Sequence, residues 1–255
     1  MRATRVALLM VWCLGAAWTA ANAQTFDRAW IDINFASAFP AQDEQFYQFQ
    51  GVLFAELATF ETAYPSMPRA SGPIAGGGVR LFGGLGVGVN FSRVKYEYPV
   101  QLGISIPHPT LPSRFATDVD ETANPLERED AAFDISAAYQ LPTPDTWRVR
   151  VFGGPTYFSL SQEMVQDINY DQAANAAGAN AVNITSFVSE KVEDSGWGFH
   201  AGVDVGYYFS RHVGVGGVFR FNRGTITIPF EPMSEEPADI KMGAAMFGGG
   251  LRLRF

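Results

Sequence analysis

The stretch WGFHAGVDVGYYF, residues 197–209, alternates between two kinds of residue at every second position. One row is mostly bulky and apolar: Trp197, Phe199, Val203, Val205, Tyr207 and Phe209. The other row is mostly small or polar: His200, Gly202, Asp204, Gly206 and Tyr208. Successive side chains of a strand point to opposite faces, so this pattern predicts a strand whose two faces meet different solvents.

The same alternation recurs along the rest of the chain. Seven further segments carry it: 31–36, 78–82, 85–92, 133–141, 147–157, 213–222 and 242–255. The total of about eight strands is even, as expected for a barrel of antiparallel strands in a bacterial outer membrane. Most of the segments begin or end near an aromatic residue, as a ring of interfacial aromatic side chains would require. We therefore predict an all-β, eight-stranded, up-and-down transmembrane barrel.

Short and long connections alternate between these strands. Tight turns are expected at Gly83, Pro144 and Arg211, and the last strand must end on the periplasmic side, which places all three turns there. The remaining connections are long. They are predicted to be extracellular loops and cover residues 38–72, 100–129, 168–195 and 229–239.

The first 23 residues have the features of a cleaved export signal. Arg2 and Arg5 form a basic region, residues 6–18 are mostly apolar, and Ala21-Asn22-Ala23 is a small-x-small cleavage site. The alternative is a retained membrane anchor, but the apolar stretch is shorter than the about 20 residues that a transmembrane helix needs. The expected domains are a signal peptide over 1–23 and an outer-membrane barrel over 24–255.

The composition of the mature chain excludes several classes of function. Without Arg2 and Arg5 it keeps 16 basic against 26 acidic residues, a net charge of −10, which does not suggest nucleic acid as a partner. Its single cysteine, Cys13, lies in the signal, so a disulfide framework and thiolate metal sites are excluded. With only three histidines, a metal site is not expected, and no cofactor is predicted.

The glycine-rich strand pair GGGVRLF, residues 76–82, followed by LGVGV, residues 85–89, and the closing LRLRF, residues 251–255, resemble the small eight-stranded outer-membrane proteins. That family includes the barrel domains of outer membrane proteins A, X and W. The resemblance covers nearly all of the mature chain and implies integral insertion in outer-membrane lipid. It also implies that the terminal aromatic residue, Phe255, is a recognition signal for the barrel-assembly machinery.

The inward row of the predicted barrel carries many polar and charged residues. The candidate lumen network consists of Asp32, Arg80, Asp134, Arg150, His200, Asp204 and Arg220. An eight-stranded barrel is only wide enough for its own side chains, and buried opposite charges are expected to pair. A lumen filled by ion pairs is therefore preferred over a continuous water pore.

Catalytic residues are not predicted. His200 and Asp204 lie four positions apart on one strand, about 13 Å along it, which is too far for a hydrogen bond. A lipid-modifying or other barrel enzyme that uses His200 or His108 remains an alternative.

The first long connection has a different pattern. Its apolar residues recur at intervals of three and four: Phe46, Phe49, Leu53, Leu57, Phe60 and Tyr64. This spacing predicts an amphipathic helix over residues 43–63, with a strand-like extension of the barrel rim as the alternative. Four phenylalanines here are candidates for an apolar ligand site or an apolar rim: Phe46, Phe49, Phe54 and Phe60.

Three functions compete at this stage. The leading one is a barrel with a structural or surface-interaction role, a largely filled lumen and no chemistry of its own. The second is a narrow channel or binding site for small apolar molecules, as the resemblance to outer membrane protein W permits. The third is the barrel enzyme. Small apolar ligands and extracellular surfaces are the further partners that these hypotheses allow.

Overall fold

The computed structural model describes residues 26–40, 45–121, 124–228 and 238–255. The predicted signal peptide over 1–23 lies outside these residues. Within them the regular structure consists of strands alone, and no helix has the length and apolar character needed to cross a membrane.

Eight strands form a closed ring in which every neighbouring pair is antiparallel. They are β1 (Ala29–Pro40), β4 (Ala70–Phe82), β5 (Leu85–Tyr98), β8 (Leu126–Leu141), β9 (Trp147–Ala174), β10 (Asn180–Tyr208), β11 (Val213–Ile228) and β13 (Ala244–Arg254). The order is β10-β9-β8-β5-β4-β1-β13-β11, and the ring closes because β11 also pairs with β10. All eight predicted strands lie in this ring, so the predicted barrel fold is confirmed.

A ninth strand, β12 (Ala238–Met242), continues the line of β13 along the same partner, β11. The two strands meet at Gly243, whose φ of +98° is a conformation that other residues rarely adopt. A Cβ atom at Gly243 would lie only 2.2 Å from the carbonyl oxygen of Asn222 on β11. Glycine is therefore required where this strand kinks.

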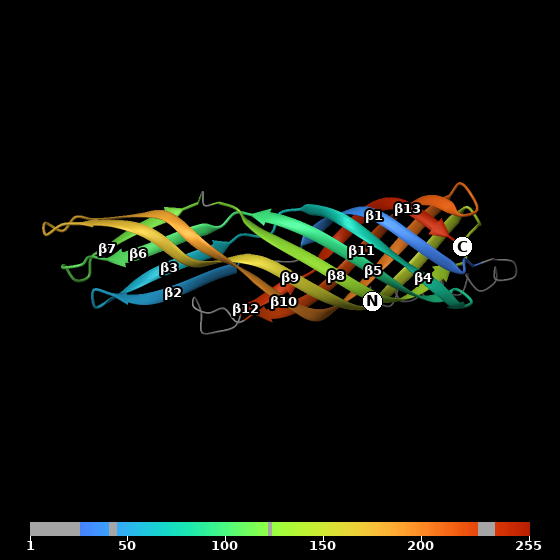
Figure 1. Ribbon diagram of the computed structural model, residues 1–255, viewed down its shortest axis with the longest axis horizontal. Coiled ribbons are helices and arrows are strands. Elements are labelled where there is room, and N and C mark those ends of the chain that lie inside the picture. Colours follow the sequence, from blue (N-terminus) through green and yellow to red (C-terminus); the bar gives the residue numbers. More distant parts are fainter. Residues whose placement is uncertain (1–25, 41–44, 122–123, 229–237) are drawn as a thin grey trace, which may run out of the picture.

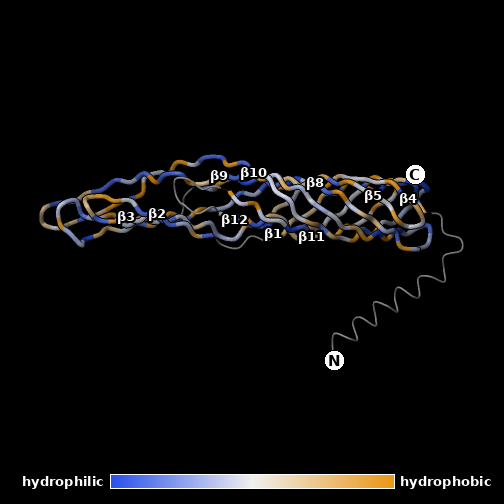
Figure 2. Tube along the Cα trace, turned by 90° about the horizontal axis from the view of Figure 1, so that it is seen from below, coloured by the Kyte–Doolittle hydropathy of each residue, from blue (hydrophilic) through white to orange (hydrophobic). Residues whose placement is uncertain are grey.

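The barrel has an apolar exterior and a polar interior. Its exposed side chains include Ile31, Ile33, Phe35, Val87, Val89, Phe91, Phe133, Ile135, Phe199, Phe219, Phe247 and Leu251. Its buried side chains include Asp32, Asn34, Asp134, Ser136, Arg150, His200, Asp204, Arg220, Asn222 and Arg252. Figure 2 shows apolar and polar residues interleaved along the barrel strands. This is the reverse of a water-soluble protein, and it is the arrangement of a barrel whose wall faces lipid.

A second sheet lies beyond one end of the ring (Figure 1). Its strand order is β2 (Gln45–Leu53), β3 (Glu56–Tyr64), β6 (Gln101–Pro107) and β7 (Phe115–Asp120). The far halves of β9 and β10 run beside it. We call this second sheet and these strand halves together the distal extension. Side chains join the layers: the rings of Phe60 and Tyr170 are 6.1 Å apart, and the backbone N–H of Ile184 donates to Asp118 at 2.7 Å.

The distal extension and the adjoining end of the barrel share one apolar core. Its buried side chains include Tyr64, Tyr98, Val100, Leu102, Ile104, Ile106, Val165 and Ile168. Three of the predicted long loops, over 38–72, 100–129 and 168–195, are thus largely strands that pack on one another. Of the fourth, 229–239, only the last two residues are described, and both belong to β12.

The predicted helix over 43–63 is wrong. The structure has a hairpin there, with β2 and β3 joined at Phe54 and Ala55, both of which have positive φ angles. The apolar residues that suggested one helical stripe lie on both faces of the hairpin: Phe49 faces Phe60 on the inner side, whereas Phe46 is on the outer side. An inner face buried against β9 stabilises the strands more than the helical spacing could stabilise an isolated helix.

Candidate functional site in the barrel lumen

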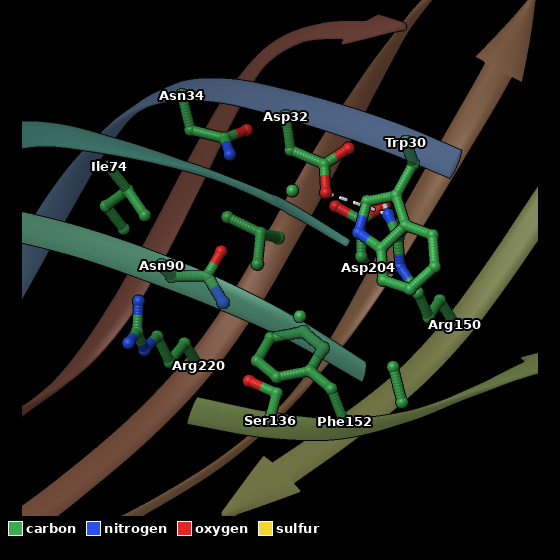
Figure 3. Close-up of a pocket in the computed structure, with 14 residues that line it drawn as sticks. Trp30, Asp32, Asn34, Ile74, Asn90, Ser136, Arg150, Phe152, Asp204 and Arg220 are labelled. Atoms are coloured by element: carbon green, nitrogen blue, oxygen red, sulfur yellow. Dashed lines mark hydrogen bonds and ion pairs between the residues drawn. The ribbon is translucent and has the colours of Figure 1, made fainter. Parts of the chain in front are cut away.

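Four charged residues meet across the lumen of the barrel, and we call them the ionic network: Asp32, Arg150, Asp204 and Arg252. The guanidinium of Arg150 donates to Asp32 at 2.9 Å and to Asp204 at 3.1 Å. That of Arg252 lies 2.6 Å from the Oδ2 atom of Asp204 and donates to Asn34 at 2.6 Å. Figure 3 shows Asp32, Asp204 and Arg150 converging beside Trp30.

The strand order places these partners on opposite walls. Arg150 is on β9 and Asp32 is on β1, which are four strands apart in a ring of eight. Their ion pair therefore crosses the full width of the lumen. Two acidic and two basic side chains balance in charge, and all four are buried, as paired charges in a medium of low polarity must be. Arg150 also lies 4.4 Å from the centre of the Trp30 ring, where it makes a cation–π contact.

A second group, the hydrogen-bonded cluster, lies next to the network and consists of Asp134, Ser136, Thr156, His200 and Arg220. Thr156 donates its hydroxyl to Asp134 at 2.6 Å, and its oxygen lies 2.9 Å from the Nδ1 atom of His200. Ser136 lies 2.8 Å from the Nε2 atom of the same imidazole. These contacts are satisfied together when Nδ1–H donates to Thr156 and Nε2 accepts from Ser136. Arg220, on β11, forms an ion pair with Asp134, on β8.

Ser136, His200 and Asp134 are the residue types of a hydrolase triad, so their chemistry needs separate consideration. Their exposed fractions are 3%, 2% and 0%, which gives a substrate no route to the hydroxyl. In addition, Thr156 hydrogen-bonds both the imidazole and the carboxylate, which lie 3.4 Å apart, and Arg220 already pairs with the carboxylate. The arrangement can hold the strands together, but it does not expose a nucleophile.

Little space remains around these groups. A cavity of about 30 Å³, lined by Trp30, Asn90, Ser136 and Phe152 among others, has room for about one or two water molecules. Toward the distal extension, apolar side chains fill the interior: Ala132, Phe158, Leu160, Ile226, Ile228, Ile240 and Met242. Arg128 lies among them and forms an ion pair with Asp130 at 2.7 Å.

Six of the seven predicted lumen residues belong to these two groups. The seventh, Arg80, lies at the turn end of the barrel, in a wide cavity that also contains Arg28 and Arg211. Three members were not among the predicted residues: Arg252, Ser136 and Thr156. All three are on the inward rows of their strands, so the alternation alone could have included them.

The other predicted residues lie far from the lumen groups along the chain and in different elements. Phe46 and Phe54 are exposed on the distal hairpin, Phe49 is 37% exposed, and Phe60 packs on Tyr170. His108 follows β6, where its Nδ1 accepts from the backbone N–H groups of Thr110 and Leu111, both at 3.1 Å. It therefore caps a turn and does not join His200. No cluster of metal-binding side chains occurs in the described ranges of the chain.

No protein-family model and no curated protein matches this chain. Solved structures of similar architecture are outer-membrane barrels. Neisserial surface protein A is 11% identical, with 89% of this chain and 97% of that chain covered and a TM-score of 0.45. The outer membrane protein OprG from Pseudomonas aeruginosa is 8% identical, with 90% and 96% covered and a TM-score of 0.48. The outer membrane protease OmpT from Escherichia coli is 12% identical, with 92% and 100% covered and a TM-score of 0.40.

Proposed function

We propose that this protein is an integral outer-membrane barrel with a closed lumen, which stabilises the envelope and presents the distal extension at the cell surface. The observation that carries the proposal is the Arg150–Asp32 ion pair, which spans the barrel inside an apolar wall. The wall suits lipid, and the interior of the described barrel is occupied by paired charges and by packed apolar side chains, which supports a closed lumen. We propose no enzymatic activity.

The orientation follows from the two ends of the barrel. Tight turns at Gly83 and Arg211, and the short 142–146 connection that contains Pro144, all lie at one end. Exported barrels carry their short turns on the periplasmic side, so the distal extension faces outward. In the same proposal, residues 1–23 are the cleaved signal that directs export, and Phe255 is the recognition signal for the assembly machinery.

A closed lumen predicts that the protein conducts no ionic current. The refolded wild-type barrel, reconstituted in a planar bilayer, should give no discrete openings, because ions cannot pass side chains that fill the cross-section. A matched Arg220→Ala sample tests whether any current comes from the protein. Openings in the wild type that this substitution alters would overturn the closed lumen and favour transport.

The surface role is tested in cells. A strain that lacks the protein should show altered envelope permeability, surface adhesion or stress resistance. Removal of the β2–β3 hairpin alone should reproduce an adhesion defect without a permeability defect, because the hairpin lies outside the ring. A deletion strain with all three properties unchanged would count against the proposal.

A binding site for small apolar molecules is the second candidate. It is favoured by the apolar core of the distal extension and by Pro155 on β9, which lacks the N–H group of a regular ladder. The pairing of β8 with β9 is interrupted there, between the pairs Asp134–Thr156 and Ala137–Gly153. The strands nevertheless stay close, since a Cβ atom on Gly154 would lie 2.1 Å from the carbonyl oxygen of Ile135.

An apolar fluorescent probe distinguishes the two candidates. If the second candidate is correct, the probe binds the purified wild-type barrel. The Phe60→Ala variant, in which the packed inner face of the hairpin is disrupted, then binds the probe at least tenfold more weakly. Phe46→Ala and Phe54→Ala then separate binding in the core from binding on the exposed rim. Absence of binding, or binding indifferent to all three substitutions, would reject the candidate.

A further inference from the structure

The turn end of the barrel contains a cavity of about 890 Å³ that neither proposed function uses. We call it the mouth cavity. Its lining includes five arginines and two aspartates: Arg28, Arg80, Arg148, Arg211, Arg254, Asp27 and Asp145. The side chains thus carry three more positive than negative charges, although the mature chain as a whole has a net charge of −10. Positive charge is concentrated at this one end.

Both aspartates are already bound by arginines. Asp27 lies 3.1 Å from the guanidinium of Arg148 and 3.8 Å from that of Arg254. Asp145 lies 3.4 Å from Arg148. Arg254 also donates to the backbone oxygens of Arg211 and Asp145 at 2.8 and 2.9 Å. Arg148 and Arg254 are therefore fixed in place by local partners.

The other three arginines of the cavity have no such partner within the part of the chain that the structure describes. Among the described residues, no carboxylate lies within ion-pair distance of Arg28, Arg80 or Arg211. Arg28 and Arg80 are also direct neighbours: the backbone N–H of Arg80 donates to the oxygen of Arg28 at 2.8 Å, beside the pair Ala29–Val79. Like charges directly opposite on adjacent strands repel, and the repulsion is relieved when an anion lies between them.

We propose that the mouth cavity binds an anion that carries more than one phosphate group. The planar guanidinium group matches the paired oxygens of phosphate, and three free guanidiniums match several negative charges. The cavity volume lies within the range of about 300–1,000 Å³ that is typical of small-molecule sites. Arg148 and Arg254 contribute further positive charge from fixed positions. The phosphates can belong to a soluble oligophosphate or to clustered lipid headgroups.

Titration calorimetry on the full barrel in zwitterionic detergent tests this. The two probes are tripolyphosphate and short-chain phosphatidylglycerol, and short-chain phosphatidylcholine is the control for lipid chains. The variant Arg28→Gln/Arg80→Gln/Arg211→Gln removes the free guanidiniums. The matched control Arg69→Gln/Arg93→Gln/Arg114→Gln removes three charges elsewhere. Circular dichroism and heat-modified gel mobility confirm that each sample is folded, and the single variant Arg80→Gln provides a milder test.

The wild type and the matched control should bind the phosphate probe with similar affinity, and this affinity should fall as salt is added. The triple variant Arg28→Gln/Arg80→Gln/Arg211→Gln should bind at least tenfold more weakly than the wild type. The single variant Arg80→Gln should show a smaller loss of affinity. Binding of tripolyphosphate alone identifies a soluble ligand, whereas binding of phosphatidylglycerol alone identifies the lipid. Binding of neither probe, or equal binding in all variants, overturns the inference. This site is independent of whether the lumen conducts, so the bilayer recordings test a separate point.

Discussion

Replacing Asp134 with alanine should lower the free energy of unfolding of the refolded barrel by about 3–5 kcal/mol. The substitution removes the ion-pair partner of Arg220, whose side chain is 1% exposed and would remain charged in the barrel interior. It also removes the acceptor of the Thr156 hydroxyl, and so weakens the contacts that hold His200. Urea unfolding in lipid vesicles, followed by tryptophan fluorescence, measures the change.

Two further variants show whether the loss of stability comes from the broken ion pair or from the shortened side chain. The double variant Asp134→Leu/Arg220→Met replaces both charges with apolar groups of similar size and should recover most of the stability. The surface substitution Glu129→Ala should cost less than about 1 kcal/mol, because its partner Arg93 is half exposed and water screens the pair. If Asp134→Ala costs no more than Glu129→Ala, the cluster does not stabilise the barrel.

The barrel strands could be predicted from the sequence because each faces two different solvents. Phe199 and His200 are adjacent in the chain, yet one is exposed on the apolar wall and the other is buried among polar groups. Only a strand with lipid on one side and a polar interior on the other repeats that contrast along its whole length. The alternation therefore indicated both the strands and the faces on which their polar residues lie.

The pairing of those polar residues could not be predicted in the same way. The alternation predicts that Asp204 points inward, but its contacts with Arg150 and Arg252 depend on the register of three strand pairs and on ring closure. Arg80 illustrates the same limit. The alternation predicts that its side chain points into the barrel, but not how far along the barrel axis it lies. It lies at the mouth rather than among the ionic contacts.

The distal extension was mispredicted for a different physical reason. Beyond the apolar wall, a strand no longer meets lipid, so its outward residues are free to be polar or apolar. On β2 the outer row holds Phe46 and Val52 beside Gln48 and Gln50. The contrast between faces is lost, and the remaining apolar residues fall by chance at helical intervals. Only the contact with β9, distant in sequence, shows which face is buried.

The largest local effect is expected at Tyr64 on β3. Its side chain is fully buried, its hydroxyl accepts from the backbone N–H of Val165 at 3.0 Å, and its ring lies 5.6 Å from that of Tyr47. Tyr64→Ala should leave a cavity and an unpaired N–H group, at a cost of about 3–5 kcal/mol. Because the ion pairs of the lumen do not involve these contacts, the distal extension should open while the barrel stays closed.

Hydrogen exchange followed by mass spectrometry tests that separation. In Tyr64→Ala, protection should fall in β2, β3 and β6 and in the far halves of β9 and β10, and should persist around Asp134 and Arg150. Phe46→Ala, on the exposed face of the same hairpin, should change little. Because the apolar core runs from Ile74 and Val94 in the barrel to Ile106 in the extension, a uniform loss of protection is the informative alternative. It would mean that barrel and extension unfold as one cooperative unit, so that a surface hairpin could not rearrange on contact with a partner without loosening the barrel beneath it.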